Sequence, residues 1–257
     1  MNHVHSAGGG LLPLLIFGVA VVYEAAATLG RRAWPWSRAM LFLTGCGLLL
    51  AGFTPQASPW PAGDFRTHML QHLVIGMFAP LALVLGAPVT LALRSLPVGA
   101  ARVVGRLLRH PAVHAVANPY VALVLNVGGM AVLFLTPLYA ATLRDPDLHL
   151  LVHMHFLLSG YLFAWVIAGP DPAPRRPSVP VRLVVLGVAI AFHSVLAQLM
   201  FAGVFVELPV PVAERRGGAD LMYYGGDIAE LLLAGALVAG WRRRPATQTG
   251  RLACSRQ

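Results

Sequence analysis

Seven long, predominantly apolar stretches recur along the chain and take up most of its length. They cover residues 11–29, 39–54, 67–92, 119–140, 149–168, 181–206 and 222–241, and the second is the shortest. Crossing the hydrocarbon core of a bilayer takes about 20 mostly apolar residues in one helix. Only 11% of the residues are charged, whereas a water-soluble domain averages about 25%. The chain therefore lacks the polar surface of a soluble enzyme, a disordered protein or a secreted disulfide scaffold.

The stretches predict an all-α integral membrane protein, a bundle of seven transmembrane helices. A β-barrel would instead show alternating strands of about 10 residues. Because the connections between the stretches are short, no separate soluble domain fits between them. We expect one transmembrane domain over residues 1–241, followed by a basic cytoplasmic tail over residues 242–257.

The arginines predict the orientation of the bundle, because basic residues favour the cytoplasmic side. All 19 basic residues are arginine, and 15 of them fall before or at the very start of the second, fourth and sixth stretches, or after the last. The N-terminus is then outside and the C-terminus in the cytoplasm, as expected for a multi-pass protein of the bacterial cytoplasmic membrane. The excess positive charge belongs to short loops beside lipid headgroups, which argues against nucleic acid as a partner.

Ionisable side chains at membrane depth are costly and therefore mark functional sites. In the expected orientation, the potential metal ligands gather in the outer half of the bundle. They are His68, Met69, His72, His149, His153, His155, His193, Met200, Asp227 and Glu230.

Helical spacing groups these residues by face. His68 and His72 share a face about 6 Å apart, and His149 and His153 repeat that spacing. His155 lies about 200° from His153, so one regular helix cannot direct both at a single site. The spacing leaves open which of these two histidines faces the bundle.

Imidazole and thioether ligands without thiolate are typical of a copper site, especially for Cu(I). Each residue also has a structural interpretation. His68 and His149 would be solvated at the interface, His72 or His153 would be core histidines bonded to a carbonyl, and the methionines would be packing residues. Asp227 would pair with a histidine or an arginine instead of binding metal.

No catalytic motif is found, and the absence of lysine excludes a retinal Schiff base. We therefore expect no enzyme. Two histidines on facing helices leave a bis-histidine b-type cytochrome open.

Four blocks resemble the multi-spanning CtaG-like cytochrome c oxidase assembly factors, a family linked to caa-type oxidases. They are THMLQHL (67–73) with Ala79-Pro80 and LGAPVTL (85–91), HMHFLLSGYLF (153–163) with GPDP (169–172), Phe192-His193 with Leu199-Met200, and YGGDIAE (224–230).

The resemblance implies a membrane protein that assembles a haem-copper oxidase and handles copper for it. Its partners would be oxidase subunits and periplasmic copper chaperones, besides membrane lipid. The residues that fall in matching blocks are His68, His72, His153, His155, His193 and Asp227. We expect weak binding of Cu(I) at the outer face, with Asp227 orienting a histidine. A structural chaperone without metal, the b-type cytochrome and a copper importer are the alternatives.

Overall fold

The structure is a computed structural model, and it describes residues 8–30, 33–54, 57–61, 63–173, 176–206 and 208–242. Within these ranges every regular element is helical and no β-strand occurs, which confirms the expected all-α fold class. Arg31, Arg32, Arg175 and the predicted tail beyond residue 242 lie outside the described residues.

The elements follow one another as helices joined by short turns. Their bounds are α1 (Gly8–Leu29), α2 (Trp36–Gly52), α3 (Phe65–Leu73), the π-helical segment η2 (Val74–Phe78), α4 (Ala79–Leu85), α5 (Pro88–Ser95), α6 (Val98–Leu108), α7 (Pro111–Val116), α8 (Pro119–Leu135), α9 (Leu138–Thr142), α10 (Pro146–Ile167), α11 (Val179–Ala202) and α12 (Val212–Arg242).

Among the described residues, five helical stretches are long and apolar enough to cross a bilayer. They are Leu11–Leu29, Phe65–Ser95, Pro146–Ile167, Val179–Ala202 and Val212–Trp241. The apolar helices α2 and α8 have 17 residues each, the lower end of the length of about 17 to 25 residues that spans the hydrocarbon core. The chain is therefore a membrane protein with five candidate spans, and seven crossings with the expected orientation remain a prediction.

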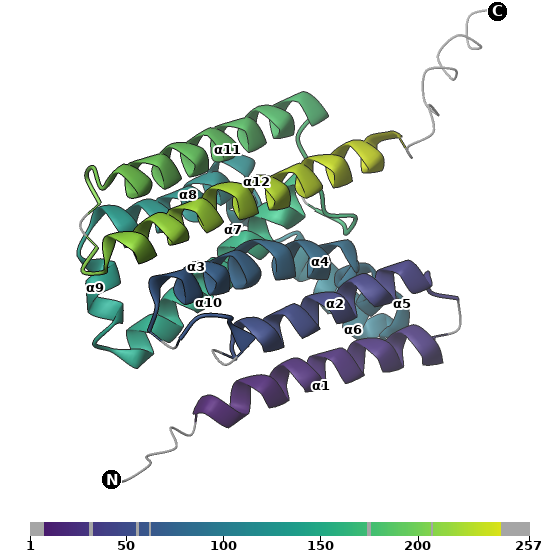
Figure 1. The fold of residues 1–257 in the computed structure, drawn as a ribbon. Coiled ribbons are helices and arrows are strands. Elements are labelled where there is room, and N and C mark those ends of the chain that lie inside the picture. The colour runs from purple at the N-terminus through teal and green to yellow at the C-terminus, as the bar shows by residue number, and fades with distance from the viewer. Residues whose placement is uncertain are drawn as a thin grey trace, which may run out of the picture.

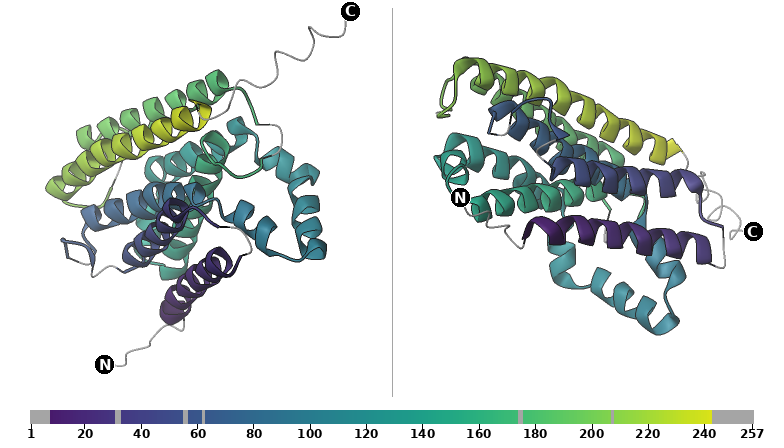
Figure 2. Two further views of the ribbon diagram at one scale, coloured as in Figure 1. Left: turned by 90° about the vertical axis from the view of Figure 1, so that its right-hand side faces the viewer. Right: turned by 60° about the horizontal axis from the view of Figure 1, so that its bottom comes forward.

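The helices lie alongside one another, with α1 at one edge and α11 and α12 at the other (Figure 1). Between these edges lie α3, α4 and α10. The start of α1 and the end of α12 lie at opposite ends of the bundle, which both views in Figure 2 also show. The starts of α3, α10 and α12 share one end of the bundle, and the start of α2 and the end of α12 share the other.

The predicted third span, residues 67–92, is not one regular helix. It widens into η2 and breaks after Gly86, where Ala87 adopts a left-handed conformation with φ 54°. Pro88 follows, and proline disfavours the right-handed helical conformation in the residue before it. The new helix α5 then begins, and the Asp171 carboxylate caps its first turn. It accepts hydrogen bonds from the Val89 and Thr90 N–H groups at 3.1 and 2.7 Å.

Two further predicted boundaries differ from the observed helices. The stretch expected over residues 119–140 ends at Leu135, and α9 is a separate turn after Pro137. Pro137 has no N–H for a helical hydrogen bond, which explains the interruption. Conversely, α12 begins ten residues before the predicted Met222, because its first turns pack on α3.

Side-chain packing at the end of the bundle where α3 and α10 begin is apolar and aromatic. One cluster there contains Phe65, Met69, Phe134, Tyr139 and Met200. At the other side of the bundle, α6 has no buried residue and exposes Val103 and Leu107 together with its arginines, as expected of a helix at a membrane surface.

Candidate metal centre

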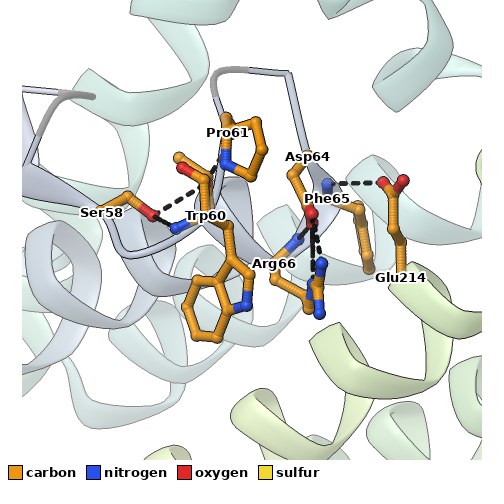
Figure 3. Close-up of polar contacts among 8 residues, drawn as sticks. Ser58, Trp60, Pro61, Asp64, Phe65, Arg66 and Glu214 are labelled. Atoms are coloured by element: carbon orange, nitrogen blue, oxygen red, sulfur yellow. Dashed lines mark hydrogen bonds and ion pairs between the residues drawn. The ribbon is translucent and has the colours of Figure 1, made fainter.

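The start of α3 is held by two carboxylates from different parts of the chain. Asp64 caps the helix by accepting a hydrogen bond from the Arg66 N–H at 2.8 Å, and it pairs with the Arg66 guanidinium at 2.6 Å. The Glu214 carboxylate, carried by α12, accepts from the Phe65 N–H at 3.1 Å (Figure 3). Hydrogen bonding from Arg66 holds the pKa of the Asp64 carboxyl below its ordinary value. These contacts fix where the first turn of α3, and with it His68, lies.

The start of α10 is set in a similar way by Asp145. Its side chain accepts hydrogen bonds from the Asp147 and Leu148 N–H groups at 2.9 and 3.2 Å, and Pro146 occupies the first helical position. Proline there is favoured because its missing N–H would have had no partner in the helix. His149 and His153 then follow one turn apart on the same face.

Three histidines from these two helices meet at one place. One ring nitrogen each of His68, His149 and His153 lies within 4.8 Å of the other two. The ring centroid of His68 is 5.4 Å from that of His149 and 5.6 Å from that of His153, and the two α10 rings are 4.5 Å apart. We call these three residues the histidine cluster.

The hydrogen bond of His153 fixes its protonation pattern. Its Nδ1 lies 3.2 Å from the backbone carbonyl oxygen of His149. A carbonyl oxygen only accepts, so Nδ1 carries the proton and Nε2 of the neutral ring carries the lone pair. A metal-binding histidine characteristically donates its other N–H in this manner. The ring of His153 is thus oriented with its free nitrogen available.

The Nε2 atoms of all three cluster residues are buried and have no hydrogen-bond partner among the residues that the structure describes. Buried polar atoms are nearly always paired, because leaving one unpaired costs about 1–3 kcal/mol. Three such atoms at one place are the arrangement that a bound cation would satisfy. The histidine cluster therefore fits a metal ion with three imidazole ligands.

Aromatic side chains enclose the cluster on one side. The rings of Tyr139 and Phe134 each pack on the His68 ring in an edge-to-face arrangement, at centroid distances of 5.0 and 6.4 Å. Phe65 packs on Tyr139 at 5.2 Å. Tyr139 is 1% exposed. These rings cover one side of His68, whereas His149 is partly exposed.

His72 lies one turn deeper on α3 than His68 and is outside the histidine cluster. It is 2% exposed, and its ring contacts Phe156 at a centroid distance of 4.4 Å. Within the described part of the chain, neither ring nitrogen has a hydrogen-bond partner. His72 is therefore a second buried imidazole on the inward side of the cluster.

His193 pairs with the carboxylate of Glu230. Its Nδ1 lies 3.3 Å from Oε1 of Glu230, and both side chains are buried. The absence of a side chain at Gly226 makes this approach possible, since a Cβ there would overlap the His193 ring. Asp227 had been expected to orient a histidine. It is only partly buried, and Glu230 makes the contact with His193 instead.

His155 faces away from the histidine cluster, contrary to its expected role as a ligand. Its Nε2 lies 3.1 Å from the Leu125 carbonyl oxygen of α8. The physical reason is the turn of about 100° per residue, which directs His153 inward and His155 toward α8. The spacing left open which of these two histidines faces the bundle, and in the structure it is His153.

Met69 and Met200 are each 0% exposed and belong to the apolar cluster described above. Met69 packs toward α12, where a Cβ at Gly218 would lie 3.0 Å from its Cγ, whereas His68 faces α10. Both methionines are therefore placed as packing residues in this arrangement.

Two functional candidates were underrated by the sequence interpretation. His149 had been weighed as a solvated residue, and Glu230 was named among the potential ligands but was given no role in the expected site. The signal for His149 was its separation of four residues from His153, which places both on one helical face.

Comparison with known proteins supplies the family. The family model described as cytochrome c oxidase caa3 assembly factor (Caa3_CtaG) matches residues 17–244. Uncharacterized proteins of Mycobacterium bovis and Mycobacterium tuberculosis are each 32% identical over 248 residues, covering 88% of this chain and 38% of the relative. One of Mycobacterium leprae is 31% identical over 252 residues, covering 90% and 38%.

The chain thus spans about 38% of the length of these curated relatives. No solved structure matches it significantly.

Proposed function

The chain belongs to the Caa3_CtaG family of cytochrome c oxidase caa3 assembly factors, and on that premise we propose that it holds a copper ion as cargo for the oxidase. The family match confirms the resemblance seen in the sequence. Copper, the ligands and the direction of delivery are the proposed part. The role is that of a carrier and not of an enzyme.

The observation that carries the proposal is the set of three unpartnered, buried Nε2 atoms in the histidine cluster. Imidazole nitrogen binds copper, zinc, iron and nickel. Copper is favoured by the family, since a haem-copper oxidase contains copper that must be inserted during assembly. Three neutral imidazoles bring no charge of their own, and a Cu(I) ion held by them exchanges more readily than one held by thiolates.

His72, His193, Met69, Met200 and Asp227 are not members of this ligand set. His72 lies next to the histidine cluster along α3 and is the residue best placed to receive an ion from it. His155 contacts α8 instead and is also outside the set.

The proposed direction of delivery is the outer face of the cytoplasmic membrane. The histidine cluster lies where α3 and α10 begin, and the arginine-rich connections lie toward the other end of the bundle. Because arginine favours the cytoplasmic side, the cluster end is assigned to the outside. Oxidase subunits and copper chaperones of that compartment are the proposed partners.

The test is an anaerobic titration of Cu(I) into detergent-purified protein against a competing chelator. We expect about one copper ion per chain, and we expect the His68→Ala/His153→Ala variant to bind at least about tenfold more weakly. His155→Ala is the matched control, because it removes an imidazole from the same helix outside the cluster. Equal binding by the wild type and the double variant would refute the copper site.

Three further measurements separate the alternatives. A titration with Zn²⁺ under the same conditions decides between the metals, because zinc also takes three histidines and a water. An absorbance spectrum of the purified protein with a Soret band would favour the bis-histidine cytochrome. Loss of the oxidase on deletion of the gene, without metal binding, would favour the structural chaperone.

A further inference from the structure

The helix α6 (Val98–Leu108) stands apart from the packed helices of the bundle. It packs mainly on α5 and α7, its neighbours along the chain, and none of its residues is buried. Figure 2 shows the segment from α5 to α7 standing out to one side of the other helices. The metal centre and the proposed delivery of copper do not use this segment.

The length and composition of α6 make it weak as an isolated helix. It has 11 residues, and isolated helices shorter than about 12–15 residues are marginal in water. Gly99 and Gly105 lower its helix propensity further. We therefore expect its stability to depend on a partner outside the described residues, and the two faces of the helix indicate the chemistry of that partner.

One face of α6 is apolar and largely exposed. Val103 and Leu107 lie one turn apart and are 56% and 63% exposed, and Val98 at the start of the helix is 67% exposed. Leu108, about 100° further round the helix, packs toward the bundle instead. Exposed valine and leucine side chains are unfavourable in water and favourable in hydrocarbon. This face therefore fits the acyl region of a bilayer.

The neighbouring face carries three positive charges. Arg102, Arg106 and Arg109 follow one another at intervals of four and three residues, which places them on one side of the helix. All three are exposed, and none forms an ion pair with a residue that the structure describes. Residues 65–144 include no aspartate or glutamate. The basic face therefore fits an anionic surface.

The residues just before α6 lie beside the end of α1, away from the histidine cluster. Ser95, the last residue of α5, donates from Oγ to the Ala26 carbonyl oxygen in the last turn of α1 at 3.4 Å. The Arg94 guanidinium lies 5.5 Å from the ring centroid of Trp34, in the connection between α1 and α2. Tryptophan beside the end of a membrane helix characteristically lies at the headgroup level. The helix therefore begins at the depth of a membrane surface.

We propose that α6 lies in the plane of the membrane surface and binds anionic phospholipid headgroups through its three arginines, with Val103 and Leu107 among the acyl chains. Guanidinium and phosphate form paired, charge-assisted hydrogen bonds. Amphipathic helices with a basic polar face characteristically lie in the interface in this way. An acidic protein surface would also match the arginines, but the bilayer offers phosphate and hydrocarbon side by side, as the two faces of α6 require.

The experiment measures which lipid surrounds α6 in the full chain. In a Cys46→Ala/Cys254→Ser background, Leu107→Cys carries a fluorophore, and phosphatidylcholine nanodiscs contain a small fraction of spin-labelled phosphatidylglycerol or phosphatidylcholine as quencher. We expect both lipids to quench, and phosphatidylglycerol to do so at least about fivefold more strongly, the preference that one arginine near an anionic surface contributes. Arg102→Gln/Arg106→Gln should remove most of this preference. Its quenching by phosphatidylcholine should stay unchanged, which shows that α6 is still in place.

Arg144→Gln/Arg216→Gln is the matched control, because it removes two exposed arginines at the other end of the bundle. Loss of the preference for phosphatidylglycerol in the α6 variant alone supports the proposal. Equal loss in the control would show a general effect of net charge and overturn it, as would an unchanged preference in the α6 variant. A fluorophore that neither lipid quenches would also overturn it and leave an acidic protein surface as the partner of α6.

Discussion

The backbone carbonyl oxygen of Gly76 lies directly against Gly160, in contact that leaves no space for a Cβ at residue 160. The contact joins η2 to α10, the helices that continue from His68 and His72 and from His149 and His153. Close approach of the two backbones there sets how far apart the two pairs of histidines stand.

Gly160→Ala is expected to force α10 away from η2. Overpacking of a buried site costs about 1–3 kcal/mol, and the displacement should also weaken Cu(I) binding. Unfolding in mixed micelles and the chelator titration measure the two effects. Gly187→Ala is the control, because α11 has open space at that position; a similar loss of stability in both variants would contradict the contact.

Glu230→Ala is expected to destabilise the fold by about 1–3 kcal/mol, because His193 would be left buried without its partner. Asp227→Ala, on the same helix but only partly buried, should change stability by no more than about 0.5 kcal/mol. Detergent unfolding monitored by tryptophan fluorescence compares them. The reverse order would contradict the pairing of Glu230 with His193.

Asp64→Asn is expected to lower the midpoint of thermal unfolding in a pH-dependent manner. The pKa of Asp64 is depressed in the folded protein, so its charged form adds stability above the unfolded pKa of about 3.9. That contribution is lost as the pH falls through the folded pKa. The difference in unfolding midpoint between wild type and variant should therefore be constant near neutral pH. It should shrink toward zero below about pH 4.

The partner of Asp64 supplies the control for this prediction. Arg66→Gln should lower the midpoint on its own and add little in the Asp64→Asn background. A pH-independent difference between wild type and Asp64→Asn would show that the charge is not what stabilises the start of α3.

Asp171→Ala is expected to cost at least about 2 kcal/mol, because the Val89 and Thr90 N–H groups would lose a buried acceptor. Asp145→Ala removes an exposed cap of α10 and should cost about 1 kcal/mol. Unfolding of both variants under one set of conditions gives the comparison. An equal or smaller loss at Asp171 would mean that α5 does not depend on this cap.

The sequence predicted the features that composition and length decide. Apolar stretches of sufficient length predicted the helices, and the family blocks predicted the family. The break at Gly86 and Ala87 was not predictable, because the apolar run continues through it. The early start of α12 was not predicted either. The charged residues Arg215 and Arg216 favoured a loop, but packing on α3 extends the helix through them.

The sequence predicted that the candidate site lies in the outer half of the bundle, but it did not predict which side chains contact one another. Helical spacing showed that His153 and His155 could not serve one site, yet choosing between them required the position of α8. Likewise Asp227 and Glu230 share a face, and only the clearance at Gly226 decides which of them meets His193. Side-chain direction within a bundle depends on neighbouring helices that sequence spacing does not specify.

The histidine cluster lies at one end of the bundle and the arginine-rich connections lie toward the other, and this separation has a consequence for biogenesis. Under the proposed function, the imidazoles would sample the metal pool of one compartment only, and the arginines that retain the other end would decide which compartment that is. Moving arginines from one set of loops to the other would then invert the molecule without changing a proposed ligand. The proposal thus implies that the metal supply is selected when the chain is inserted into the membrane.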